Sequence, residues 1–101
     1  MKLPVIKHLN SFIENNDEDY LVEAIEVLED LTEVSSLKDE ELDVIGELIS
    51  NMYGALEVHA EVKKGTPKKE ALNGFMKRVW VLLINDQYFT VFNTHKNSLI
   101  V

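Results

Sequence analysis

The chain has 101 residues, no cysteine and a net charge of −8. This length fits a single domain with a modest core. The absence of cysteine excludes disulfides, thiol catalysis and cysteine-based metal centres, and the negative charge argues against nucleic-acid binding. The longest apolar run, residues 79–84, is too short to span a membrane, and residues 1–4 do not resemble a signal peptide. We therefore expect a cytoplasmic protein with no nucleic-acid or membrane partner.

Charge divides the chain into three parts. Residues 1–62 hold sixteen acids and three bases, residues 63–78 hold one acid and six bases, and residues 79–101 hold one of each. The first part is typical of acidic amphipathic helices and the second of a basic helix. The third part is largely apolar and follows neither pattern.

Two short helices are predicted in the first 31 residues. Pro4 suits the first turn of a helix, and apolar residues follow it at helical spacing up to Ile13. The pattern breaks at residues 15–17, where Asp17 is a good N-cap for the next helix. The apolar stripe of that second helix consists of Leu21, Ala24, Ile25, Leu28 and Leu31.

A long helix is predicted from about residue 37 to about residue 64. Ser36 and Asp39 have the spacing of a weak capping box, and Gly65 is the expected left-handed stop. The side of this helix predicted to be buried carries Leu42, Ile45, Leu48, Ile49, Met52, Leu56 and Val62.

Thr66 and Pro67 then indicate an N-cap and the first position of a fourth helix, which should run to about residue 84. We expect it to pack antiparallel to the long helix because the connection is short. Residues 85–86 indicate a turn, and residues 88–92 and 98–101 have strand-like composition. The prediction is that the helix continues through at least Val81 and that residues 88–92 are extended and packed on the bundle.

The predicted fold is therefore all-α. It consists of a four-helix domain over residues 1–84 with a long central helix, and of an apolar C-terminal extension over residues 85–101. That extension is expected to be an extended segment or a short β-hairpin.

Three small residues, Gly46, Ser50 and Gly54, recur at four-residue steps along the long helix. Each glycine costs about 1 kcal/mol of helix propensity relative to alanine, so a close approach by another backbone is expected there. That neighbour is either another helix of the same chain or a second copy of the protein.

No catalytic or metal-binding motif emerges, and no cofactor is expected. His59 has no potential ligand three or four residues away, and His8 and His95 are equally isolated. An alternative hypothesis is a small enzyme or a metal- or ligand-binding subunit that uses Glu47, Asn51, Glu57 and His59. The acidic cluster at Asp39, Glu40, Glu41, Asp43 and Glu47 is either a solvated face or a contact for a basic protein partner.

Three stretches, residues 1–7, 41–59 and 71–79, resemble an uncharacterised bacterial family of short acidic helical proteins, a domain of unknown function. The resemblance covers about residues 1–79 and implies no activity. It implies that one surface contains Gly46, Ser50, Asn51, Gly54, Glu57 and His59. The apolar tail departs from the family pattern, either as a native extension or as an altered reading frame.

The functional hypothesis is a non-enzymatic interaction or adaptor module that acts as a homo-oligomer, most simply a dimer. The long helix and the apolar tail are the expected contacts, since large apolar patches mark interfaces. In the tail, the candidate contact residues are Trp80, Phe89 and Phe92.

Overall fold

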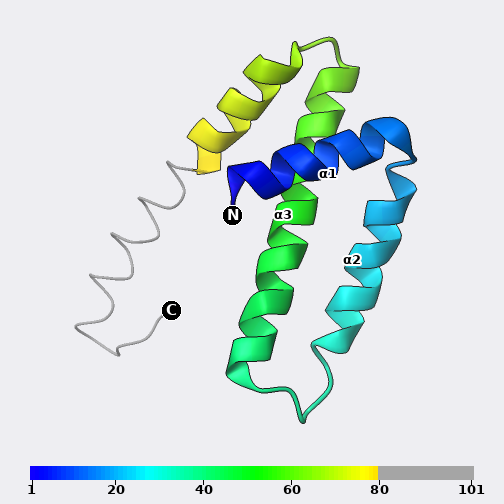
Figure 1. Ribbon diagram of the computed structural model, residues 1–101, viewed down its shortest axis with the longest axis vertical. Helices are drawn as coiled ribbons and strands as arrows, with labels where there is room; N and C mark the ends of the chain where they lie inside the picture. The colour runs from blue at the N-terminus through cyan, green and yellow to red at the C-terminus, as the bar shows by residue number, and fades with distance from the viewer. Residues whose placement is uncertain (80–101) are drawn as a thin grey trace, which may run out of the picture.

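The computed structural model describes residues 1–79, and Figure 1 shows their arrangement. Its elements are α1 (Leu3–Asn15), α2 (Asp19–Leu31), α3 (Asp39–Lys63) and a fourth helix described over residues 68–79. These four helices, with no strand among the described residues, confirm the all-α prediction. The predictions for Val81, for residues 88–92 and for the tail contacts Trp80, Phe89 and Phe92 fall outside the described residues.

The long helix α3 is the centre of the molecule. α2 runs beside it in the opposite direction, α1 crosses its middle, and the fourth helix returns along its C-terminal half (Figure 1). The fourth helix turns back along α3, as predicted, and packs against it where Gly54 lies near Phe75 (Figure 1).

The helix ends follow local chemistry, although the predicted N-cap residues differ from those observed. An Asp17 carboxylate oxygen accepts a hydrogen bond from the Asp19 N–H at 2.9 Å and so caps the first turn of α2, but the N-cap position itself is occupied by Glu18. At the start of α3, Glu41 reaches back to the Lys38 N–H at 2.9 Å. Ser36 was the wrong choice of cap, because α3 begins at Asp39, with Lys38 as its N-cap.

The turn into the fourth helix matches the prediction only in part. Gly65 has φ +108°, the left-handed conformation expected of a helix stop. The Thr66 hydroxyl, however, donates to the Glu61 carboxylate at 3.3 Å instead of capping the next helix. The first helical hydrogen bond there joins the Ala71 N–H to the Pro67 carbonyl.

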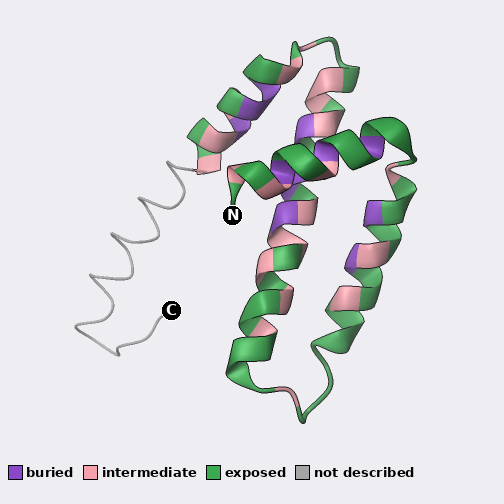
Figure 2. Cartoon of the chain, viewed as in Figure 1, coloured by how far each residue is buried: buried purple, intermediate pink, exposed green. Residues whose placement is uncertain are grey.

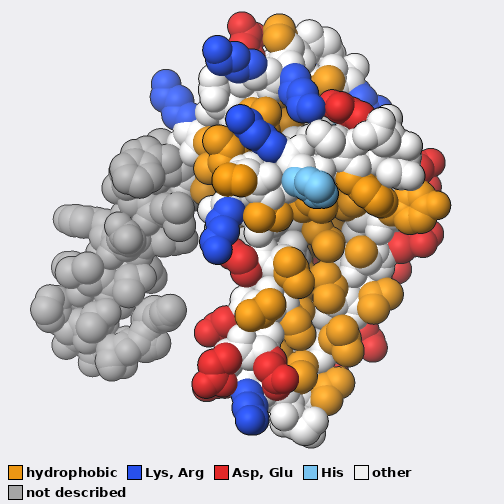
Figure 3. All heavy atoms as spheres, in the orientation of Figure 1, with side chains coloured by type: hydrophobic (Ala, Val, Ile, Leu, Met, Phe, Trp, Pro, Cys, Tyr) orange, Lys and Arg blue, Asp and Glu red, His pale blue; other side chains and the backbone are white. Residues whose placement is uncertain are grey.

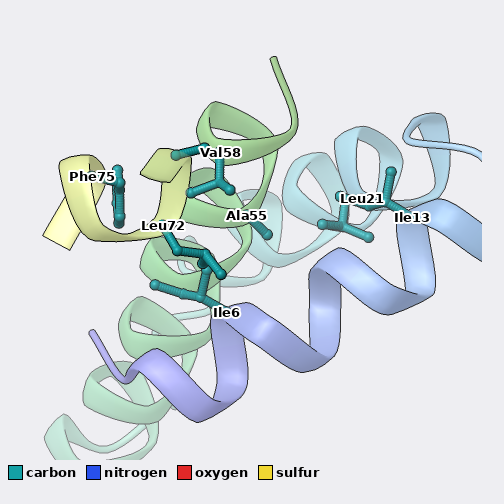
Figure 4. Packing of buried hydrophobic residues seen from close by; sticks show 8 residues of the cluster. Ile6, Ile13, Leu21, Ala55, Val58, Leu72 and Phe75 are labelled. Carbon is teal, nitrogen blue, oxygen red and sulfur yellow. The ribbon is translucent and has the colours of Figure 1, made fainter. Parts of the chain in front are cut away.

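The core lies where α1 crosses the other helices, and we call this region the four-helix junction (Figure 2). Ile6 points toward Leu72 and Phe75, and Ile13 lies beside Leu21 (Figure 4). Each helix contributes to this cluster, whose buried members are Ile6, Ile13, Leu21, Ala55, Val58, Ala71, Leu72 and Phe75.

Candidate interaction surface

The small-residue positions of α3 have different environments. Gly54 is buried, and a Cβ built on it would lie 2.9 Å from the Phe75 ring and 3.2 Å from Ile6. A Cβ on Gly46 would meet nothing within 4 Å, and Ser50 is partly buried. The close approach predicted for this stripe therefore occurs at Gly54, and the neighbours are helices of the same chain.

Asn51 and Glu47 hold the start of α1. Asn51 is only 1% exposed, and its side-chain oxygen accepts a hydrogen bond from the Lys2 N–H at 2.8 Å. The Met1 amino group lies 2.9 Å from a Glu47 carboxylate oxygen. Asn10 adds a second bond between the helices, donating to the Ala55 carbonyl at 2.9 Å. These polar groups fix where α1 crosses α3.

Glu57 and His59 point to different neighbours. The Glu57 carboxylate accepts a hydrogen bond from Arg78 of the fourth helix at 3.2 Å. His59 Nε2 lies 3.9 Å from a carboxylate oxygen of Glu18, beside α2. The structure thus brings Asn51 and Gly54 to the junction, leaves Gly46 open, and directs Glu57 and His59 toward opposite flanks.

An ion pair and a side-chain hydrogen bond connect the α2 region to α3. Lys63 Nζ lies 2.7 Å from Glu18, and the bond and charge of Lys63 lower the pKa of the Glu18 carboxyl. The same pairing raises the pKa of Lys63. The Tyr53 hydroxyl donates to Glu29 at 3.0 Å, which raises the pKa of Tyr53. These exposed contacts orient the two helices.

Among residues 1–79, no cluster of three histidines, aspartates or glutamates has the geometry to hold a metal ion. No helix in the described part of the chain is long and apolar enough to cross a membrane. An open groove of about 580 Å³ lies between α1 and the fourth helix, where Leu3 and Leu72 meet Lys7, Lys68 and Lys69. Lys68 is paired with Glu14 at 3.0 Å.

The clearest surface feature is the end of the α2–α3 hairpin that lies below α1 in the view of Figure 1. The second half of α2, the following loop and the first half of α3, residues 26–50, form what we call the hairpin arm. Within this fully described segment no residue is buried (Figure 2). α1 and the fourth helix pack on the other half of α3, so only two helices face each other in the arm.

An apolar strip runs along the hairpin arm on the side from which α1 packs. Val44 and Leu48 come seven residues, or two turns, before Asn51 and Ala55, so they continue the same face of α3. On α2, Leu28 continues the face of the buried Leu21. We define the apolar strip as Leu28, Leu31, Val44 and Leu48, and Figure 3 shows hydrophobic atoms gathered over the lower halves of α2 and α3.

The members of the apolar strip are far from buried. Val44 is 59% exposed, Leu31 41% and Leu48 40%. Leu28 is partly buried. The prediction that Leu48 lies on a buried side was wrong, because α1 crosses α3 beyond it. Exposed apolar groups aligned along two neighbouring helices are typical of an interface.

Acidic side chains surround the strip. The hairpin arm holds nine acids and one base, Lys38, while the rest of the chain holds nine acids and nine bases. The arm therefore carries the whole net charge of −8. Glu40, Asp43 and Glu47 form a row along α3, and Figure 3 shows acidic atoms on both sides of the hydrophobic band.

Comparison with known proteins identifies relatives for most of the chain. The model of a family of unknown function, DUF6952, matches residues 1–83. The chain belongs to this family. The match confirms the resemblance predicted over residues 1–79 and extends it by four residues. No curated protein and no solved structure matches the chain.

The DUF6952 match includes the junction and the hairpin arm, so both are parts of the family region. The sequence indicated the arm only through its acidic cluster, which was interpreted as a solvated face or a contact for a basic partner. The exposure of Val44, Leu31 and Leu48 was missed. It depends on where α1 crosses α3, and the hydrogen bonds of Asn51 and Asn10 that fix this position leave no periodic signal.

Proposed function

We propose that this protein is a non-enzymatic interaction module that binds its partner through the apolar strip of the hairpin arm. The observation that carries the proposal is the strip itself: large aliphatic side chains exposed in line on two packed helices. Burying each such side chain yields about 1.5–3 kcal/mol, so a partner that covers the strip gains considerably.

A non-enzymatic role is supported by the contacts of the four residues weighed as an alternative site. Glu47 pairs with the Met1 amine, Asn51 binds the Lys2 N–H, Glu57 binds Arg78 and His59 faces Glu18. The first two contacts join α3 to the start of α1, the third joins α3 to the fourth helix, and the fourth joins α3 to Glu18 before α2. These residues act as ties between helices, which gives the enzyme or metal-binding alternative no support.

The experiment is site-specific photo-cross-linking in cells that express the full chain. A photoreactive residue at Val44, in the strip, should form cross-links to a protein partner. The matched control is Val22, which is 39% exposed on α2 and lies outside the hairpin arm. It comes nine residues, or about two and a half turns, before Leu31, so it faces away from that strip residue. Cross-links at Val44 above those at Val22 support the proposal, and equal yields at both positions contradict it.

Self-association is the second part of the proposal, and it comes from the sequence. A dimer is expected through the long helix and the apolar tail. Light scattering on the purified protein measures it directly. A mass of two chains supports the dimer, and a clean monomer at high micromolar concentration contradicts it.

A further inference from the structure

We propose that the apolar strip is the docking site of an amphipathic helix whose apolar face is flanked by lysine or arginine residues. This inference rests on the proposed function and specifies the chemistry of the partner. It follows from the shape of the hairpin arm, from its charge, and from what the rest of the chain offers as a competing occupant.

The shape of the site is that of an incomplete helical layer. In the four-helix junction, α1 lies across α2 and α3 and covers Leu21 and Ala55. In the hairpin arm the same two faces continue as Leu28 and Leu48, and no segment among residues 1–79 covers them. A further helix laid along the arm between α2 and α3 would bury these faces, as α1 buries them in the junction. In helix-in-groove recognition, the docked helix inserts apolar side chains at positions i, i+3, i+4 and i+7 into the groove.

The length of the arm sets the length of the partner. The first half of α3, residues 39–50, contributes twelve residues to the arm. At about 1.5 Å per residue this half-helix is roughly 18 Å long. A partner helix of about three to four turns is therefore enough to cover the strip.

The negative charge of the arm favours a partner helix with basic residues beside its apolar face. With nine acids and one lysine in residues 26–50, any docked segment is surrounded by carboxylates. Glu40 lies one helical turn before Val44, and Asp43 is its neighbour in the sequence. A lysine next to the partner's apolar face can therefore reach either carboxylate. Such pairs favour the correct partner and speed its encounter, while like charges across the interface are penalised.

Three occupants from this chain match the site less well. A second hairpin arm would bring another charge of −8 against the first. The basic fourth helix of a second copy has the right charge, but its apolar residues Ala71, Leu72 and Phe75 are already buried in its own junction. Residues 80–101 are rich in apolar residues, but they hold one acid and one base and so do not complement the arm.

The test uses two fluorescently labelled synthetic peptides of fourteen residues with identical leucines at helical spacing. One peptide carries lysines beside the leucines, and the other carries glutamates at the same positions. Fluorescence anisotropy measures binding of each peptide to the full chain. We expect the lysine peptide to bind more than about tenfold more tightly, because like charges across an interface are strongly disfavoured. Its affinity should fall from about 0.05 to about 0.5 M salt, since the Debye length shrinks about threefold.

Variants locate the binding site. Val44→Glu with Leu48→Glu should weaken binding of the lysine peptide by more than about tenfold, because each large side chain kept from an apolar contact is worth about a decade of affinity. Val22→Glu is the matched control, outside the hairpin arm, and should bind like the unmodified protein. Glu40→Lys with Asp43→Lys should weaken the lysine peptide and strengthen the glutamate peptide. Circular dichroism checks that each variant remains helical.

The inference is overturned if the full chain binds neither peptide, binds both equally, or binds the lysine peptide unchanged after Val44→Glu with Leu48→Glu. These outcomes are separate from those of the cross-linking experiment. Cross-links at Val44 together with no preference for the lysine peptide would leave an interaction module with a partner of different chemistry. Equal cross-linking at Val44 and Val22 would remove the proposed function as well.

Discussion

The two halves of α3 have the same backbone conformation and opposite environments. The C-terminal half contains the buried residues Asn51, Gly54, Ala55 and Val58, whereas the N-terminal half, residues 39–50, contains none. The difference lies in where the other helices pack. Glycine and alanine at positions 54 and 55 let Phe75 and Ile6 approach, while Val44 and Leu48 lie beyond the α1 crossing and project into solvent. Residue size alone does not decide burial, since the small Gly46 lies in the open half as well.

The largest test of this comparison is truncation of one aliphatic side chain in each region. Ile6 is fully buried in the junction, so Ile6→Ala should lower the free energy of unfolding by about 2–5 kcal/mol. Leu48 is 40% exposed in the arm, so Leu48→Ala should cost less than about 1 kcal/mol. Urea denaturation of the two variants measures both values. Equal losses would mean that the arm is as tightly packed as the junction.

The second test adds volume instead of removing it. Gly54→Leu should cost about 1–3 kcal/mol, because its side chain would collide with the Phe75 ring. Gly46→Leu, two turns away on the same helix, is the control. It should stabilise the protein by up to about 1 kcal/mol, because nothing lies within 4 Å and leucine favours the helix. Thermal denaturation of both variants would contradict the comparison if their melting temperatures fell together.

The third test concerns the bond that fixes where α1 crosses α3. Asn51→Ala leaves the Lys2 N–H without its acceptor and should cost about 1–3 kcal/mol. Ser50→Ala, at the adjacent and partly buried position, should change stability by less than about 0.5 kcal/mol. Chemical denaturation gives the difference, and hydrogen exchange at α1 should quicken in Asn51→Ala alone. Unchanged exchange there would show that packing, not Asn51, positions α1.

Much of the fold could be predicted because its signals are local. The Asp17 cap, the left-handed Gly65 and the apolar periodicity of α1 and α2 each depend on a few neighbouring residues. The same is true of the antiparallel return of the fourth helix, since the short turn at Gly65 dictates it.

The apolar strip could not be predicted because burial depends on contacts far apart in the sequence. Leu48 and Leu56 both belong to the side of α3 that the sequence predicts to be buried. Only the tertiary arrangement makes Leu48 exposed and Leu56 partly buried. The crossing of α1 is set by Lys2 with Asn51 and by Asn10 with Ala55, pairs that are 49 and 45 residues apart. No windowed pattern in one sequence reports such pairs, so the acidic cluster was the only sign of the hairpin arm.

The smallest expected effect concerns the ion pair that closes the junction end of the α2–α3 hairpin. Lys63 lowers the pKa of Glu18 from its ordinary value of 4.5. A carboxyl whose pKa is lowered by folding stabilises the protein above its unfolded pKa, and this contribution is lost as the pH falls through its folded pKa. Lys63, whose pKa is raised by the same pair, loses its contribution as the pH rises through its higher folded pKa, so the pair stabilises the protein fully between about pH 4.5 and pH 10.5.

Glu18→Gln should therefore lower the melting temperature slightly at pH 7, and the difference from the unmodified protein should vanish as the pH falls from 4.5 through the lowered pKa of Glu18. The effect is small because both side chains are exposed and water screens the pair. Glu23→Gln on α2 removes the same formal charge, and Glu23 has no ion pair among the described residues, so it controls for general repulsion in an acidic protein.

Calorimetry between pH 3 and pH 7 compares the three proteins. If Glu18→Gln and Glu23→Gln followed the same curve, the contact at 2.7 Å would contribute nothing beyond net charge. A pH-dependent gap between them would assign that part of the stability to the junction half of α3, which contains all the buried residues of that helix.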